Sequence, residues 1–215
     1  GCDVYGVWSP HYLDYFKKYS KLMSPENIFY SGLLRPIKNF NKTKPFKRIS
    51  SNSLRVLIIS EPLINVREVI PYVKALLKND AIELAIKVRP MINDTYYEEL
   101  KVHLPEISNL KVHSGTIEEI GRDYDVFIGS NSTAVIEGSL FGKISILLNT
   151  KKFGDYFEMD SLIPGHSLLV NEPEFLCQNI VDRVNNEVYL QTVDKIRARF
   201  FGDNKDGSQW LIDQL

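Results

Sequence analysis

The amino-acid sequence predicts an α/β fold, a doubly wound parallel sheet of about six strands preceded by a short N-terminal βαβ appendage. From residue 54 onward, short runs rich in β-branched residues alternate with segments of helical period, which is the pattern of repeated βα units. Strands joined in this way form a parallel sheet that helices cover on both faces. The alternation of strands and helices, continued over six predicted strands, indicates the fold class.

Each element is placed by its local pattern. The predicted strands span residues 54–60, 82–88, 110–113, 125–129, 144–149 and 168–170. After the first strand, a helix at 66–78 places Val66, Ile70, Val73 and Leu77 near one face. The other predicted helices span residues 132–141, 174–188, 192–201 and 208–215.

The first 53 residues differ in kind from the rest of the chain. An apolar strand at 4–8 leads to a helix that begins at Ser9-Pro10 and runs to about residue 21, and a second strand follows at 27–31. Residues 36–53 are rich in Lys, Asn and Ser, and we interpret them as a linker. The sequence therefore predicts two domains, residues 1–53 and residues 54–215.

The bulk composition excludes several classes of protein. Of 215 residues, 44% are hydrophobic and 25% are charged, which is typical of a globular protein. The 26 basic and 27 acidic side chains leave a net charge of −1, so no global field attracts nucleic acid. Cys2 and Cys177 have no disulfide or zinc spacing, and no apolar run approaches the roughly 20 residues that cross a membrane. We expect a cytoplasmic protein, and a start at Gly1 without Met suggests a piece of a longer one.

The fourth predicted strand runs directly into a turn rich in hydroxyl groups. Gly129 permits a tight turn, and Ser130, Asn131, Ser132 and Thr133 follow it at the start of the next helix. A helix start offers unpaired N–H groups to an anion, and ligands of open parallel sheets bind beyond the carboxyl ends of the strands. We therefore expect phosphate binding at this turn. The alternative is that the turn only caps its helix.

Glu137 lies within the apolar helix that follows this turn. A carboxylate in such surroundings needs a polar partner to offset the loss of its hydration, and a ribose diol is suitable. The alternatives are an exposed helix face and an ion pair with Lys143.

Two other strand ends bring polar groups to the same edge of the sheet. The second strand ends in Lys87-Val88-Arg89-Pro90, where the proline ends the strand and Arg89 can form two hydrogen bonds with a diphosphate. The alternative for Arg89 is a solvated charge. The first strand ends in Ser60 and Glu61, which are further candidates for phosphate or sugar binding.

The remaining candidates rest on less specific signals. The third strand ends in His113-Ser114, where either side chain can face the base or ribose, although a structural histidine is more common. His166, in the loop before the last strand, can approach the same cleft. The chain has no G-x-G-x-x-G, no P-loop and no G-x-S-x-G, which argues against dinucleotide dehydrogenases, nucleoside triphosphatases and hydrolases with a nucleophile elbow.

Together these segments resemble the C-terminal, nucleotide-sugar-binding lobe of the GT-B glycosyltransferases, which has a Rossmann-like fold. Residues 137–146, EGSLFGKISI, look like the family's Glu-Ala helix followed by Gly-x-Pro-Val-Ile. Residues 165–174 are similar to its glycine loop, short strand and closing helices. Lys87 to Pro90 stand where bacterial capsule sialyltransferases, Kdo transferases and glycerophosphate transferases have a His-Pro pair, and residues 130–133 resemble their serine motif. Two positions depart from the family pattern, since Arg89 replaces the His and Gly129 stands where many retaining members have a glutamate.

The resemblance implies a donor-binding domain of a glycosyltransferase that transfers a sugar from a nucleotide-sugar to a surface or capsular polysaccharide. Ser130, Ser132 and Thr133 would hold the donor phosphate, Arg89 would neutralise leaving-group charge and Glu137 would hold the ribose. Residues 1–53 would be the end of an N-terminal lobe plus the interlobe linker. The rest of that lobe is then an expected partner, and the isolated chain is expected to be a poor enzyme.

Two other functions stay open. One is a sugar-nucleotide epimerase or hydrolase of the same fold. The other is a non-catalytic lobe for assembly, whose apolar patch would comprise Tyr5, Trp8, Tyr12, Tyr15 and Phe16, unless these pack against the missing lobe. We expect a nucleotide-sugar and a saccharide acceptor as partners, no nucleic acid, and a peripheral complex at the inner face of the membrane as an open alternative. No cofactor or metal site is expected, although a diphosphate can bring Mg²⁺ with it.

Overall fold

The computed structural model describes residues 3–34, 53–89, 95–163, 165, 167–184 and 186–214. The chain divides into a small unit, comprising Gly1–Thr43 and Asp194–Leu215, and a large unit, Lys44–Val193. The predicted boundary after residue 53 adjoins the stretch 35–52, which lies outside the described residues, so the boundary and the linker stay predictions. We describe each unit by itself.

The large unit is built on a six-stranded parallel sheet in the order β5-β4-β3-β6-β7-β8. The strands are β3 (Leu54–Ile59), β4 (Ile82–Lys87), β5 (Lys111–His113), β6 (Val126–Gly129), β7 (Ile144–Leu148) and β8 (Leu169–Val170). The chain starts at the centre of the sheet, adds two strands on one side, and then crosses to the other side at β6. This is the doubly wound Rossmann-like order. The prediction of the fold class is confirmed, and each strand is predicted to within one residue at either end.

Helices cover both faces of this sheet. They are α2 (Val66–Leu77), α3 (Tyr96–His103), α4 (Ile117–Ile120), α5 (Thr133–Glu137), α6 (Leu176–Val184) and the first part of α7 (Glu187–Phe201). Short 3-10 segments connect them at η3 (Pro105–Asn109), η4 (Gly121–Asp123), η5 (Gly138–Phe141), η6 (Met159–Ser161) and η7 (Pro173–Phe175). The sequence did not predict α3 or α4, and α7 begins at Glu187 rather than near residue 192.

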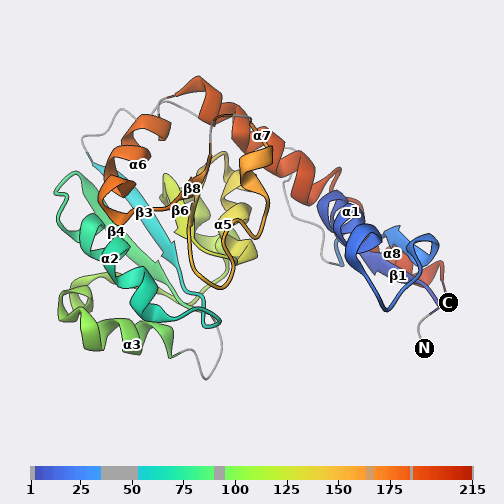
Figure 1. The fold of residues 1–215 in the computed structure, drawn as a ribbon, viewed down its shortest axis with the longest axis horizontal. Coiled ribbons are helices and arrows are strands. Elements are labelled where there is room, and N and C mark those ends of the chain that lie inside the picture. The colour runs from blue at the N-terminus through green and yellow to red at the C-terminus, as the bar shows by residue number, and fades with distance from the viewer. Residues whose placement is uncertain are drawn as a thin grey trace. The chain divides into compact units, whose positions relative to one another are not determined.

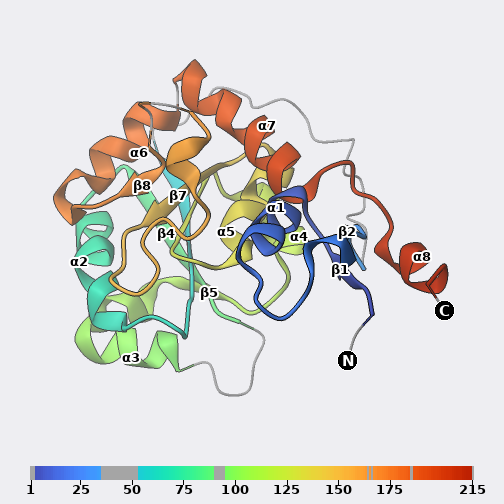
Figure 2. The same ribbon diagram turned by 45° about the vertical axis from the view of Figure 1, so that its right-hand side comes forward.

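The main core lies between one face of the sheet and the helices α2, α3 and α6. Val56 and Ile58 of β3 pack there with Val73 of α2 and Ile180 of α6. Figures 1 and 2 both show α2 and α6 side by side on this face. The Tyr72 hydroxyl donates to the carbonyl oxygens of Val170 and Asn171, at 3.1 and 2.9 Å, and so ties α2 to β8.

The opposite face of the sheet is covered by α5 and η5 at very short range. The Ser145 hydroxyl on β7 donates to the carbonyl oxygen of Val135 at 2.7 Å. A Cβ atom on Gly138 would lie 2.8 Å from the ring of Phe127, and one on Gly129 would lie 2.5 Å from Cγ2 of Val135. Gly129 is therefore required by this close approach of α5 to β6, and its φ is not positive as a tight turn would need.

The small unit is a βαβ element, as predicted. The parallel strands β1 (Tyr5–Val7) and β2 (Ile28–Tyr30) are joined through α1 (Pro10–Tyr19) and the 3-10 turn η1 (Pro25–Asn27). Ser9 caps α1 by accepting a hydrogen bond from the Tyr12 N–H at 3.1 Å.

The end of the chain belongs to the same unit. The last part of α7 packs there through Phe201, whose ring centroid lies 6.0 Å from that of Trp8. The helix α8 (Gly207–Ile212) follows. Tyr5 and Tyr15 are partly exposed, whereas Trp8 is half-buried. Among the described residues, no helix has both the length and the apolar character that crossing a membrane requires.

The packing at Gly129 generates a prediction about stability. Gly129→Ala should destabilise the protein by about 1–3 kcal/mol, because the β-branched Val135 side chain is stiff within a helix and cannot move aside cheaply. Urea unfolding followed by circular dichroism measures this difference.

Gly115→Ala is the matched control for this experiment. Its added Cβ would meet the exposed carboxylate end of Glu119, which accepts a capping hydrogen bond from the Thr116 N–H, and its φ is not positive, so its cost should be limited to that exposed bond. Equal unfolding midpoints for Gly129→Ala and the wild type would contradict the role of this close contact.

Candidate functional site

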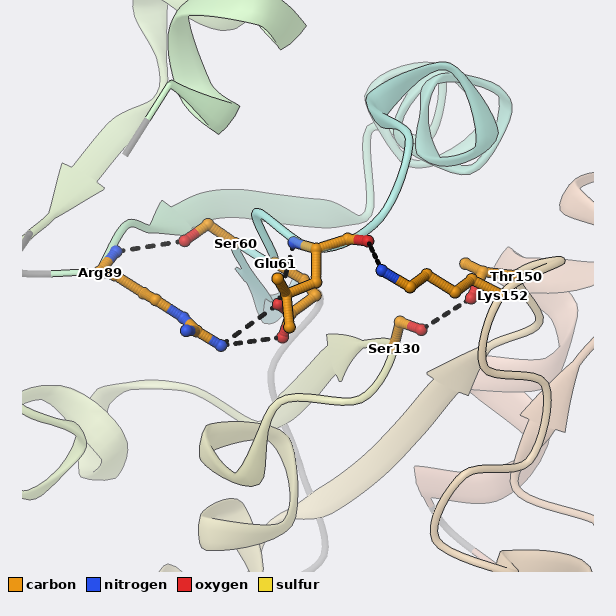
Figure 3. Close-up of polar contacts among 7 residues, drawn as sticks. Ser60, Glu61, Arg89, Ser130, Thr150 and Lys152 are labelled. Atoms are coloured by element: carbon orange, nitrogen blue, oxygen red, sulfur yellow. Dashed lines mark hydrogen bonds and ion pairs between the residues drawn. The ribbon is translucent and has the colours of Figure 1, made fainter. Parts of the chain in front are cut away.

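The candidate site lies at the carboxyl edge of the sheet, around the switch between β3 and β6. β3 and β6 are hydrogen-bonded neighbours, but β3 continues to β4 on one side of the sheet, whereas β6 continues to β7 on the other. The loops that leave such a pair diverge and open a crevice, in which open α/β sheets bind their ligands. Figure 3 shows the polar side chains that meet there.

The ends of β3 and β4 are joined by buried polar contacts. Ser60 is fully buried and accepts a hydrogen bond from the Arg89 backbone N–H at 3.1 Å. The Arg89 Nη2 atom lies 3.2 and 3.0 Å from the two carboxylate oxygens of Glu61 (Figure 3). Glu61 is 1% exposed and also accepts a hydrogen bond from the Leu63 N–H at 3.2 Å. The Arg89 side chain is 36% exposed. Arg89 is therefore not the solvated charge of the alternative interpretation, because it is held by a carboxylate at the ligand edge.

The hydroxyl-rich turn after β6 is held from β7 and not by its own helix. The hydroxyls of Ser130 and Thr150, both buried, lie 3.0 Å apart. Ser132 occupies the N-cap position of α5, but its side chain makes no capping hydrogen bond. The Asn131 Oδ1 atom is buried without a hydrogen-bond partner among the described residues. The alternative that this turn merely caps its helix is therefore wrong for Ser132.

The helix after the turn is shorter than predicted. α5 ends at Glu137, and the chain continues as a 3-10 turn to Phe141, with Gly142 in the left-handed region at φ 70°. A macrodipole sums over aligned peptide units, so five residues contribute little of it. An anion at this turn would therefore depend mainly on side-chain donors and cations.

Glu137 of α5 is close enough to Lys87, at the end of β4, for the charge of the lysine to act on its carboxyl group. Burial raises the pKa of the Glu137 carboxyl above its usual value, whereas the positive charge of Lys87 and a hydrogen bond from Thr133 act in the opposite sense. The predicted alternative of an ion pair with Lys143 is not what the structure shows. The Lys143 ammonium lies 3.6 Å from the carboxylate of Asp125, at the start of β6 and the opposite edge of the sheet.

The end of β5 lies beside the end of β4, where His113 is the cross-strand partner of Lys87. His113 contacts the Tyr124 hydroxyl through Nε2 at 2.6 Å, and burial, reinforced by the charge of Lys111, lowers the pKa of its imidazole. Ser114 is exposed beyond the edge strand and makes no hydrogen bond to the other candidates among the described residues. Pro90 and His166 lie outside the described residues.

Two functional candidates were missed in the sequence, and both follow β7. Thr150 pairs with Ser130, and Lys152 donates from Nζ to the carbonyl oxygen of Leu63 at 3.2 Å (Figure 3). The sequence contained a signal for both, because they follow a predicted parallel strand. The carboxyl end of β7 reaches the same sheet edge as the ends of β3, β4 and β6. Which loops touch across this edge depends on the strand order, and the sequence does not show that order.

No metal site is formed by the part of the chain that the structure describes. Among those residues, no group of three or more His, Cys, Asp or Glu side chains is placed to hold an ion. Binding of Mg²⁺ together with a diphosphate stays a prediction.

Known structures share this fold. No family model matches the chain, and no curated protein matches it significantly. A glycosyltransferase from Rickettsia africae superposes with a TM-score of 0.62 at 14% identity, over 98% of this chain and 62% of that one. Staphylococcus aureus TarM, in complex with Fondaparinux, alpha-GlcNAc-glycerol and UDP, has a TM-score of 0.59 at 16% identity, over 98% of this chain and 43% of that one. Glycosyltransferases use this fold.

A third similar structure is S. aureus MnaA in complex with UDP. Its TM-score is 0.61 at 10% identity, over 98% of this chain and 58% of that one. The chain thus spans less than two thirds of the length of each of the three structures. At these identities the likeness is one of fold, so the function has to be argued from the site.

The environment of Glu137 generates a prediction about pH dependence. Because the pKa of this carboxyl is raised in the folded state, the folded protein binds the proton more readily than the unfolded chain. Ionisation therefore lowers the stability as the pH rises through the folded-state pKa, and has no such effect below the unfolded-state value. Glu137→Gln, which stays neutral, should be more stable than the wild type at about pH 8 and equally stable below about pH 4.

Urea unfolding at the two pH values measures the effect. Glu106→Gln, at an exposed position in η3, is the control and should change neither midpoint. A Glu137→Gln variant that is less stable than the wild type at high pH would show that the carboxylate stabilises the fold.

Proposed function

We propose that this chain is the donor-binding part of a glycosyltransferase that transfers a sugar from a nucleotide-sugar to a surface or capsular polysaccharide. One observation carries the proposal. The buried polar groups of Ser60, Glu61, Ser130 and Thr150 all lie at the carboxyl ends of β3, β6 and β7, around the switch between β3 and β6. Buried polar groups are costly, and a ligand at this edge is the reason to keep them. The glycosyltransferases of the same fold, including TarM with UDP, support this interpretation.

The proposed roles follow from the chemistry of each side chain. The hydroxyls of Ser130, Ser132 and Thr133 donate to the donor phosphates, and the buried Oδ1 of Asn131 accepts from a ligand N–H or O–H group. Glu137 binds the ribose diol through its two oxygens. These groups position the donor and stabilise the charge of the departing nucleotide, which are the two contributions expected from a donor-binding lobe.

The proposal assigns donor binding to this chain and sugar transfer to the whole protein. The chain spans less than two thirds of the solved transferases, so an acceptor-binding surface and a base are expected from further protein. The proposed place of action is the cytoplasmic side of the membrane, where nucleotide-sugar donors are available to enzymes of surface-polysaccharide synthesis.

Nucleotide binding tests the proposal directly. Calorimetric titration with UDP, CDP, CMP and GDP should detect binding of at least one nucleotide. Ser132→Ala and Arg89→Ala should each weaken that binding about tenfold or more, as expected when a hydrogen bond to a charged group is lost or a guanidinium is removed from the edge. A melting curve for each variant separates lost binding from lost folding.

Ser108→Ala and Arg122→Ala are the matched controls. Both side chains are exposed in 3-10 segments that precede a strand, so they lie at the opposite edge of the sheet and should not affect binding. Failure of the wild-type chain to bind any of the four nucleotides would refute the donor-binding function and favour the assembly lobe. Product analysis with the full-length protein separates the enzymes, since an altered or released sugar without acceptor indicates an epimerase or hydrolase.

A further inference from the structure

The two cations at the end of β4 are already engaged within the fold. Arg89 forms an ion pair with Glu61 at 3.0 Å. Lys87 is buried and acts on Glu137, which also senses the negative charge of Glu118. The Arg89 charge is therefore already paired, and the buried Lys87 ammonium donates to the carbonyl oxygen of Val88 at 3.1 Å. A diphosphate at this edge would bring further negative charge and needs a further cation.

Lys152 is placed to supply that charge. It follows β7, and its Nζ atom donates to the carbonyl oxygen of Leu63 in the loop after β3. β6 lies between β3 and β7 in the sheet, so the Lys152 side chain crosses the carboxyl end of β6. Figure 3 shows it extending past the Ser130–Thr150 pair toward the loop of Glu61. The ammonium group and the two hydroxyls thus belong to one part of the edge.

The charge of Lys152 is not cancelled within the described part of the chain. Its hydrogen-bond partner there is a neutral carbonyl, and no described carboxylate lies within ion-pair distance of Nζ. An ammonium group has three donors, so a contact with one carbonyl leaves capacity for phosphate oxygens. The backbone beside it is fixed, because the Lys151 N–H donates to the Glu68 carboxylate at 2.7 Å.

We propose that Lys152 is the cation that binds the diphosphate of the donor, together with the hydroxyls of Ser130 and Thr150. The inference rests on the proposed donor-binding function. It divides the edge into two parts. The diphosphate lies over the ends of β6 and β7, whereas the Arg89–Glu61 pair and the Glu137 carboxylate exchange hydrogen bonds with the uncharged hydroxyl groups of the ligand. Lys152 would also stabilise the negative charge of the nucleotide diphosphate as it leaves.

The test compares ligands with and without phosphate on matched lysine variants. UDP, uridine and inorganic pyrophosphate are titrated into the wild type, Lys152→Ala, Lys152→Gln, Lys152→Arg and the control Lys151→Ala. Lys151 is the adjacent exposed lysine, and its described contact is made by its backbone N–H, which alanine retains.

The expected result separates charge from loop structure. Lys152→Ala and Lys152→Gln should weaken UDP and pyrophosphate binding about tenfold or more and reduce the salt dependence of binding, with uridine unchanged. Lys152→Arg should retain most of the affinity, and Lys151→Ala should resemble the wild type. A loss of uridine binding equal to that of UDP would show that Lys152 only shapes the loop, and would overturn the inference.

The failures of the inference and of the proposed function are distinguishable. If the wild type binds UDP, and Lys152→Ala binds UDP equally well or Lys151→Ala weakens it as much, the diphosphate is held elsewhere. Donor binding then stands, and Lys152 loses its role. If the wild type binds neither pyrophosphate nor any of UDP, CDP, CMP and GDP, the donor-binding function and the inference both fall.

Discussion

The order of the six parallel strands is the constraint on which the candidate site depends. β3 is the first strand of the large unit and takes the centre of the sheet, and right-handed connections then place β4 and β6 on opposite sides of it. The apolar core holds these strands in register through residues such as Val56, Ile58 and Ile128. Ser60 and Ser130, which follow these strands directly, are therefore positioned by core packing. A site built in this way is largely formed before a ligand arrives.

Paired charges characterise both edges of this sheet, but with different consequences. At the amino edge, Asp125 accepts from the Arg55 backbone and side chain and pairs with Lys143, so its charge is fully used within the fold. At the carboxyl edge, Arg89 pairs with the buried Glu61 and still leaves 36% of its side chain exposed. The raised pKa of Glu137 indicates that its carboxylate is kept at a cost in stability, as is common for groups that serve a ligand.

Close backbone packing determines what kind of anion site this edge can be. Gly129 lets Val135 of α5 lie against the end of β6, and Gly138 lets η5 lie against Phe127 of β6, at distances that any side chain would obstruct. The segment is then a five-residue helix and a 3-10 turn, too short for a strong macrodipole. Phosphate binding at this edge would therefore depend on hydroxyl groups and on a cation from the loop after β7. For this reason Thr150 and Lys152 are as important to the proposed site as the turn after β6.

The sequence by itself determined the strands and the residues at their ends. A run of β-branched residues indicates a buried strand without knowledge of the rest of the chain, and the residue that follows the run is then known from the sequence. It did not predict α3 or α4, since these helices have few residues and a weak apolar period. The sequence left open whether Glu137 pairs with Lys143, whether Arg89 is solvated and whether Ser132 caps its helix. The tertiary structure decided all three points. Lys143 forms an ion pair with Asp125, and Arg89 forms one with Glu61. The Ser132 side chain makes no capping hydrogen bond to its helix. Residues far apart in sequence, such as Leu63 and Lys152, meet only because the strand order brings their loops together. Strand order is a property of the whole chain rather than of any segment.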